Sequence, residues 1–279
     1  MTDLHPDWIV PDWPAPASVR AFVTTRAGGV SPAPFESMNL GLRSGDAADN
    51  VLRNRVRLRR RLPSDPVWLR QVHGALTLDA AGDHADEIEA DAAWSAAPNV
   101  VCTVMVADCM PVMLCDRDGG AVAVAHAGWR GLAGGVIEAT VRAMRTPPAR
   151  LMAWLGPAIG PARFEVGADV LKAFTALDAQ AAAAFVPYPG RAGKWLCDLG
   201  MLARQRLAAL GVTQVFGGGL CTVDDARFFS HRRDAGRSGR MAALIWIDPD
   251  RNAEVNRTAA PGVAFNRSRA GSARGAAIR

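Results

Sequence analysis

The sequence predicts an α/β fold in which mixed central β-sheets are flanked by helices. Hydrophobic residues make up 49% and charged residues 21% of the 279 residues, which is typical of a globular chain with a substantial core. Short apolar runs rich in β-branched residues alternate with amphipathic, helix-like stretches. Neither a repeat nor a Pro/Gly-rich linker interrupts residues 20–248. We therefore expect one domain over residues 1–248, followed by a disordered Arg- and Ala-rich tail over residues 249–279.

The first predicted elements follow a proline-rich, extended lead-in at residues 6–16. Residues 19–25 form a short strand-like run that ends at the turn-forming sequence Arg26-Ala27-Gly28-Gly29. Residues 46–62 predict a helix, because apolar residues alternate with arginines and Pro63 follows the pattern. Residues 67–72 predict the next strand.

A buried hairpin is predicted near the middle of the chain. Residues 100–106 are apolar without polar alternation, as in a strand buried on both faces. Pro111 is expected to interrupt the strand pattern, which resumes at residues 112–115. The turn-forming residues 116–120 then lead into a strand at residues 121–125.

Helices and strands alternate in the second half of the body. Residues 131–144 predict a helix with one apolar face, and Gly211 marks the end of another helix at residues 199–210. The other expected elements are a strand at 151–155, a turn at 156–161, a helix at 166–176, and strands at 214–216 and 241–247.

Charge and cysteine content narrow the class of protein. Residues 255–279 contain five arginines and no acid, which equals the net charge of +5, so the remaining body is formally neutral. No basic face interleaved with aromatics is apparent, so we expect no nucleic-acid partner. No signal peptide or membrane-length apolar run is apparent either, so we expect no membrane partner. The five irregularly spaced cysteines predict reduced thiols in a cytoplasmic protein.

Three of the predicted strands lead to side chains that bind metals. His73 follows residues 67–72, Cys109 follows residues 100–106 and His126 follows residues 121–125. Two imidazoles and one thiolate suit a tetrahedral zinc ion that keeps its fourth position for water or substrate. The hypothesis is therefore a catalytic metal site, formed by strand ends that converge in the fold.

Several charged residues near these ligands are candidates for other roles. Asp108 could orient a neighbouring imidazole, although capping of a turn is an equal alternative. Arg130 lies at the start of the predicted 131–144 helix, where backbone N–H groups and a guanidinium together can bind an anion. Arg26, with Gly28 and Gly29 shortly after it, is a second candidate anion contact or simply part of a surface turn. His231 and Arg232 belong either to a solvated loop or to a phosphate or substrate site.

A series of short blocks, spread in order over nearly the whole body, carries a recognisable pattern. They are residues 24–31, 38–41, 71–73, 107–109, 126–131, 156–161, 164–166, 230–234 and 239–241. In these blocks the chain resembles the laccase-domain family, also called multicopper polyphenol oxidase-like proteins. Members of that family are now treated as purine nucleoside phosphorylases, and one bacterial branch is described as a peptidoglycan editing factor.

The resemblance implies an α/β/β/α-like layered sandwich, similar to the fold of toxin deamidases, with zinc held at His73, Cys109 and His126. It also implies phosphorolysis of adenosine, inosine and S-methyl-5′-thioadenosine to base plus sugar 1-phosphate, with adenosine deamination as a second activity. Purine nucleosides and phosphate would be the partners of a monomer or homodimer. Asn39, within one of the blocks, joins Arg26, Arg130, His231 and Arg232 as a candidate substrate or phosphate contact.

The assignment of proton transfer stays open in the sequence. Asp108 and His231 are the candidates, with His73, Cys109 and His126 as the other catalytic residues. Two positions depart from the family pattern: Ala162 stands where many members have Cys, and His231 stands where Tyr is common. The change at His231 is expected to affect substrate preference rather than the metal.

Three alternatives use the same residues. A copper-dependent polyphenol oxidase is one, because two His, one Cys and an axial Met can bind copper, and methionines lie nearby. A full multicopper laccase, however, needs more imidazoles than the five histidines of this chain. The axial candidates are Met105, Met110 and Met113.

The second alternative is a hydrolase that edits peptidoglycan precursors, with Cys109 as nucleophile and His126 as its base. The third is a structural zinc site, which normally has four protein ligands. It would need Cys102, Cys115 or His84 to join the cluster.

Overall fold

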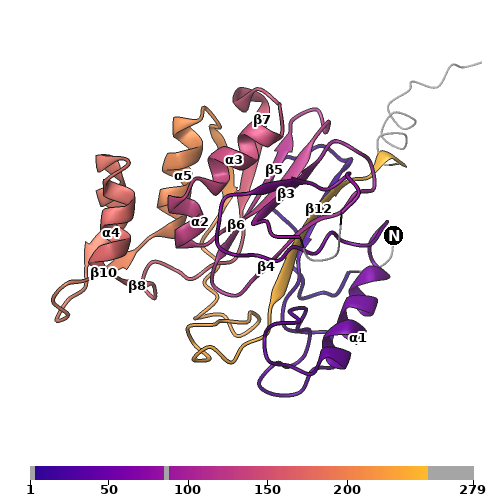
Figure 1. The fold of residues 1–279 in the computed structure, drawn as a ribbon, viewed down its shortest axis with the longest axis horizontal. Helices are drawn as coiled ribbons and strands as arrows, with labels where there is room; N and C mark the ends of the chain where they lie inside the picture. The colour runs from indigo at the N-terminus through magenta and orange to yellow at the C-terminus, as the bar shows by residue number, and fades with distance from the viewer. Residues whose placement is uncertain (1–3, 85–87, 251–279) are drawn as a thin grey trace, which may run out of the picture.

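The computed structural model describes residues 4–84 and 88–250 and confirms the predicted mixed α/β fold. Two sheets pack face to face, and helices cover the outer face of each (Figure 1). The layers therefore run helices, large sheet, small sheet, helix. All helix and strand labels below follow Figure 1.

The large sheet has six strands in the order β11-β7-β5-β6-β3-β2. β5 pairs antiparallel with both β6 and β7, whereas β11 and β7, and β2 and β3, run parallel. This mixture of directions matches the mixed sheet expected from the sequence. The strands are β2 (Thr77–Asp79), β3 (Ala92–Ser95), β5 (Met110–Asp116), β6 (Val122–Ala127), β7 (Leu151–Leu155) and β11 (Gln214–Gly217).

The small sheet has three antiparallel strands, β1 (Val19–Val23), β12 (Met241–Ile247) and β4 (Cys102–Val106), with β12 in the centre. All seven residues of β12 are buried, because successive side chains enter different layers. Met241, Ala243 and Ile245 pack between the two sheets, whereas Leu244 and Trp246 pack on the outer face. An uninterrupted apolar run in the sequence therefore indicates a strand that is covered on both faces, in the middle of the sandwich.

Helices α2 (Trp129–Ala133), α3 (Val136–Ala143) and α5 (Leu199–Ala209) contribute to the core on the outer face of the large sheet. Helix α1 (Ala48–Arg59) buries Leu58 against the outer face of the small sheet (Figure 1). Beside α2 and α5, a third sheet of β8 (Glu165–Gly167), β9 (Phe185–Pro187) and β10 (Lys194–Cys197) packs with α4 (Ala168–Thr175). Two short 3-10 helices, Pro148–Arg150 and Ala179–Ala184, complete the described elements.

Three expectations about single elements were wrong: a strand at residues 67–72, one helix over residues 131–144, and an interruption of the strand at Pro111. Residues 67–72 form only isolated bridges at Val67 and Arg70 instead of a strand. The Gln71 side chain replaces part of a strand ladder, since its amide bonds both the N–H and the C=O of Met105. The single helix over 131–144 is two helices, divided at Gly135, whose φ of +88° is left-handed.

Pro111 does not interrupt its strand. β5 runs through it, and Pro111 pairs with His126 of β6. On the other side, β7 ends at Leu155, and the Pro111 carbonyl accepts a bond from Gly156 N–H. Pro111 therefore sits near the start of the strand and beyond the end of its neighbour, where the missing N–H is tolerated.

The short strands β2, β3, β8, β9 and β10 had no counterpart among the predicted elements. Each has only three or four residues, too few to show a period in the sequence. The predicted tail lies, from residue 251 onward, outside the described residues. Among the described residues, no helix is long and apolar enough to cross a bilayer.

Candidate metal centre

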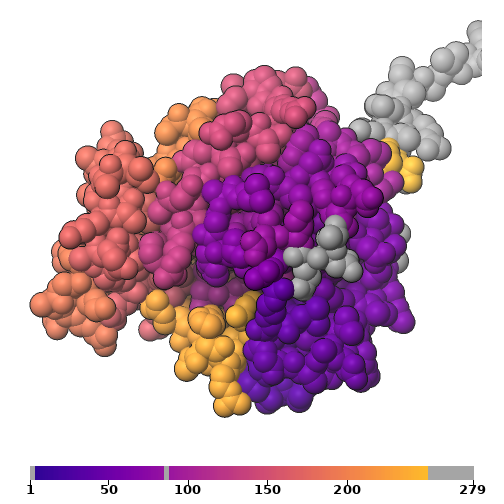
Figure 2. All heavy atoms as spheres, in the orientation of Figure 1, coloured from indigo at the N-terminus to yellow at the C-terminus, as the bar shows by residue number. Residues whose placement is uncertain are grey.

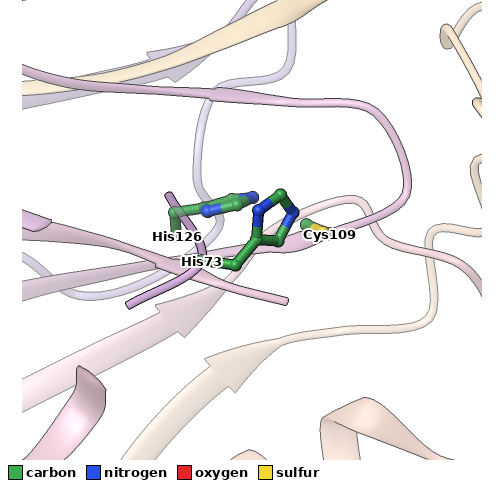
Figure 3. Close-up of side chains that lie close together, drawn as sticks. All are labelled: His73, Cys109 and His126. Carbon is green, nitrogen blue, oxygen red and sulfur yellow. The ribbon is translucent and has the colours of Figure 1, made fainter. Parts of the chain in front are cut away.

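His73, Cys109 and His126 meet at the edge where the two sheets separate. Cys109 lies in the link that carries the chain from β4 of the small sheet to β5 of the large one. His126 lies near the end of β6, and His73 lies in the loop before β2. One ligand atom from each side chain lies within 4.8 Å of the other two (Figure 3). The structure therefore brings together the three residues that the sequence proposed as ligands.

The His73 loop is held by one buried carboxylate. Asp91 accepts hydrogen bonds from the backbone N–H groups of Val72, His73 and Gly74 at 3.1, 2.9 and 2.6 Å. His73 itself has a φ of +60°, in a region that costs free energy for a residue with a side chain. The Asp91 bonds offset that cost and fix the direction of the imidazole.

Asp91 also orients His126. Its Oδ1 lies 2.9 Å from His126 Nδ1, and the carboxylate is fully buried. This bond leaves Nε2 of His126 for a metal ion, as in the carboxylate–histidine pairs of metal enzymes. Asp91 was not among the residues predicted from the sequence, although it directly precedes the short apolar run that becomes β3.

Asp108, expected either to orient an imidazole or to cap a turn, joins two loops. Its two carboxylate oxygens accept bonds from the Thr222 hydroxyl at 2.5 Å and from the Arg232 backbone N–H at 2.6 Å. Asp108 therefore ties the loop that carries His231 to the Cys109 link. Its φ of +82° helps to turn that link sharply between the two sheets.

Cys109 and His126 each shift the pKa of the other. Burial raises the pKa of the Cys109 thiol, but the His126 and His73 imidazoles lower it, to about 6. Burial lowers the pKa of His126, but the Cys109 thiolate and Asp91 raise it, to about 9. Burial likewise raises the pKa of Asp91, and the bonds from His126 and Gly74 lower it below the usual value. The thiolate, which is the form that binds metals, is thus favoured at neutral pH.

Gly128 allows the three ligands to approach one another. A Cβ atom at this position would lie 2.6 Å from Cys109 Sγ and 3.4 Å from His73 Cδ2. No larger residue fits without displacing the thiol. The glycine that follows His126-Ala127 therefore has a steric function in the site.

The cluster opens into a pocket of about 290 Å³. His231 lines this pocket, as predicted for a substrate contact, and Arg240 lines it too. The remaining lining residues are Gly41, Leu42, Arg43, Ser44, Leu69, Gln71, Met105 and Ala107, with the three candidate ligands.

Four other predicted contacts do not line this pocket. Arg26 pairs with Glu36 at 3.3 Å and lines a different hollow. Arg130 is exposed, and its guanidinium lies 4.4 Å above the Trp129 ring in the five-residue helix α2. The Arg232 side chain reaches the Glu165 carbonyl, and Asn39 is fully buried below the pocket. The sequence patterns located these residues but not the direction of their side chains.

The sequence pattern described as multi-copper polyphenol oxidoreductase laccase matches residues 20–248. The chain belongs to this laccase family.

Relatives of this laccase-family chain include a purine nucleoside phosphorylase of Pseudomonas aeruginosa, 55% identical over 86% of this chain and 98% of the relative. Purine nucleoside phosphorylase YfiH of Escherichia coli is 52% identical over 86% and 98% of the two chains. The crystal structure of a Neisseria meningitidis protein of the DUF152 family is similar, with a TM-score of 0.83 and 48% identity over 87% and 99% of the chains. YlmD from Geobacillus stearothermophilus has a TM-score of 0.76 at 31% identity, over 88% and 98%.

The donor set of this laccase-family chain fits a metal such as copper or zinc. Within residues 4–84 and 88–250, His73, Cys109 and His126 are the one cluster of this kind, and neither Cys102, Cys115 nor His84 belongs to it. A fourth protein ligand is therefore absent from the described part, so a metal held by these three residues would keep one coordination position for a ligand from the pocket that they line. That arrangement is typical of a catalytic site, not of a structural one.

Proposed function

We propose that the protein is a zinc-dependent purine nucleoside phosphorylase that cleaves adenosine, inosine and S-methyl-5′-thioadenosine, with adenosine deamination as a second activity. The observation that carries the proposal is the single three-ligand cluster with one position open to the pocket. Relatives more than 50% identical along nearly their whole length bear the phosphorylase name, which supports the same chemistry. We place this activity in the cytoplasm, where the five free thiols stay reduced.

Two His and one Cys suit a single zinc ion better than they suit a multicopper centre. Bound here, zinc would supply Lewis acidity and an acidified water. His73, Cys109 and His126 would hold it, and Asp91 would keep His126 in the tautomer that exposes Nε2. A multicopper centre needs further histidine clusters, and the described residues contain no second group of metal-binding side chains.

Phosphorolysis requires a bond exchange at C1′ of the ribose. An oxygen of hydrogenphosphate attacks C1′ while the bond from C1′ to the purine nitrogen breaks and its electron pair goes to the base. The proton of hydrogenphosphate ends on the released purine, so atoms and charge balance. His231 lines the pocket and is the residue we assign to carry this proton. Asp108 is occupied by Thr222 and Arg232, so it has a positioning role instead.

The Cys–His hydrolase is the second candidate, since the thiolate–imidazolium pair of Cys109 and His126 is also the state a cysteine nucleophile needs. Metal dependence separates the two functions. A nucleophilic Cys109 must be free of metal, whereas the phosphorylase needs its thiolate on the metal.

The test is an inosine assay on protein of measured zinc content, with and without inorganic phosphate. We expect hypoxanthine and ribose 1-phosphate only when both zinc and phosphate are present. Substitutions His73→Ala, Cys109→Ser and His126→Ala should each abolish the release. Undiminished phosphate-dependent release by these variants would contradict the proposal, and activity of metal-free protein on peptidoglycan fragments would favour the hydrolase.

A further inference from the structure

A phosphorylase pocket needs a cation for its phosphate, and the two arginines proposed from the sequence do not line it. Arg26 and Arg130 belong to other surfaces. The guanidiniums that do line the pocket belong to Arg43, which is exposed, and to Arg240, which is partly buried directly before β12. Arg240 is the less exposed of the two.

Of the three guanidinium nitrogens of Arg240, Nη1 is the one with hydrogen-bond partners among the described residues. Its Nη1 donates to the backbone carbonyls of Ser238 at 2.7 Å and Gly239 at 3.0 Å. No ion pair to an acidic side chain is formed by Arg240 within the described residues. The Nε and Nη2 groups therefore keep three N–H donors for another acceptor. A partly buried guanidinium with spare donors is the usual partner of a phosphate.

Arg240 lies in the same pocket as the candidate metal ligands, since Arg240, His73, Cys109 and His126 all line it. A phosphate bound to Arg240 would lie beside the open coordination position.

The N-terminal part of the chain sets the position of Arg240. The Oδ1 atom of Asn39 accepts bonds from the backbone N–H groups of both Gly41, at 3.1 Å, and Arg240, at 2.9 Å. The N–H of Leu40 in turn donates to the Arg240 carbonyl. Figure 2 shows late, yellow residues packed against the early, indigo ones at this side of the body. Two segments 200 residues apart in sequence are thereby joined.

Gly41 is required for the path of the Arg240 side chain. A Cβ atom on Gly41 would lie 2.7 Å from Arg240 Cγ and 3.1 Å from its Cβ. Since Cγ is near the root of the side chain, an alanine here would redirect the whole guanidinium. This predicts that Gly41→Ala acts through Arg240.

We propose that Arg240 binds the phosphate co-substrate, and that Asn39 and Gly41 are positioning residues that aim its guanidinium into the metal pocket. This inference rests on the phosphorylase function proposed above. It also gives Asn39, expected from the sequence as a ligand contact, an indirect role.

The main test is steady-state kinetics of the zinc-loaded full chain with inosine and phosphate varied separately. Arg240→Gln should raise the KM for phosphate about 10- to 100-fold, the effect of losing charge-assisted hydrogen bonds, while the KM for inosine stays within about twofold. Arg240→Lys should recover part of the loss, because it keeps the charge without the planar fork. The matched control is Arg53→Gln, an exposed arginine of α1. An unchanged KM for phosphate in Arg240→Gln would overturn the proposal.

The positioning role has its own test. Gly41→Ala should raise the KM for phosphate in the wild-type background but add little to Arg240→Gln, a non-additivity expected when two changes act on one group. Gly200→Ala on α5 is the control glycine. Equal effects of Gly41→Ala in both backgrounds would reject the role, and thermal unfolding of each variant identifies a folding defect.

Binding of inorganic phosphate, followed by phosphorus NMR line broadening, separates this inference from the proposed function. Phosphate binding that needs Arg240, without release of base, would overturn the phosphorylase and uphold the phosphate site. Phosphate-dependent release with unaltered phosphate binding in Arg240→Gln would do the reverse. Absence of both binding and release in the wild type would overturn both.

Discussion

The two walls of the metal pocket differ in how firmly the fold holds them. The closed wall comprises the partly buried Cys109 and His126, which is 4% exposed, with the fully buried Asp91 bonded to His126 behind it. On the open wall, His73 and His231 are exposed and lie in loops. The closed wall is fixed by strand pairing, whereas the open wall is fixed by single side chains that bond to loop backbone.

This difference separates two tasks. A ligand on a buried strand is held before the metal arrives, so little ordering is needed on binding. A ligand on a loop leaves room for a substrate to enter. The exposed imidazole of His73 joins the two walls, because Asp91 holds its backbone while also bonding the His126 ring. The predictions below disrupt first the closed wall and then the open one.

The largest effect is expected from Gly128→Ala. The added Cβ atom would collide with Cys109 Sγ at 2.6 Å and push the thiol out of the cluster. Bound zinc, measured by metal analysis after dialysis, should fall from one equivalent to near zero, and phosphorolysis should be lost with it. Gly200→Ala, on the remote helix α5, should retain both; full zinc content in Gly128→Ala would show that the close approach is not needed.

The second-largest effect is expected from Asp91→Asn. The change removes the charge beside His126 and weakens three backbone bonds of the His73 loop. Zinc affinity, measured by competition with a chelator, should fall about 10- to 100-fold, the usual cost of losing such a partner. Asp108→Asn should change zinc affinity much less, since Asp108 bonds Thr222 and Arg232. The reverse order of the two variants would contradict the roles assigned here.

Alkylation of the metal-free protein tests the thiolate of Cys109, on the closed wall, without an activity assay. The pKa of Cys109 is lowered to about 6, whereas burial raises the pKa of Cys197 to about 12 and also raises those of Cys102 and Cys115. Because the thiolate is the reactive form, iodoacetamide should label Cys109 first, at a rate that falls as the pH drops through about 6. Mass spectrometry of peptides measures the site and the rate. Zinc should protect Cys109; a midpoint near 9 would show that the imidazoles do not stabilise the thiolate.

The smallest effect is expected on the open wall, from His231→Tyr, because a Tyr hydroxyl can take over the proton transfer that we assign to His231. His231 lines the pocket without belonging to the metal cluster, so zinc content should stay the same. The ratio of kcat/KM for adenosine to that for inosine should change by a few fold, measured by base release. An unaltered ratio together with unaltered kcat would remove His231 from the substrate and proton-transfer roles.

On the closed wall, Cys109 and His126 were predictable from the sequence, whereas Asp91 was not. Cys109 and His126 follow long apolar runs, and such runs report burial and strand ends directly. Asp91 was missed because β3 has four residues, and because its bonds reach His126, 35 positions away. Sequence periodicity carries no information on a contact of that kind.

Local sequence patterns were equally unable to predict which arginines line the pocket. Arg130 and Arg26 stand beside glycines, as anion-binding arginines do, yet Trp129 and Glu36 hold them elsewhere. Arg240 also follows a glycine, Gly239, but its place beside the pocket depends on Asn39, which is remote in sequence, so the local pattern did not single it out. The layered fold was accessible for the opposite reason, because strands as apolar as 241–247 can only be central. The division into a domain ending at residue 248 and a tail stays a prediction.

Zinc titration of the metal-free protein tests the central claim most directly. Hypoxanthine release from inosine in the presence of phosphate should rise linearly with added zinc and stop rising at one equivalent, as expected for the single cluster of His73, Cys109 and His126. No release should occur without phosphate at any zinc concentration. Full phosphate-dependent release before any metal is added would contradict an open metal centre as the basis of this protein's activity.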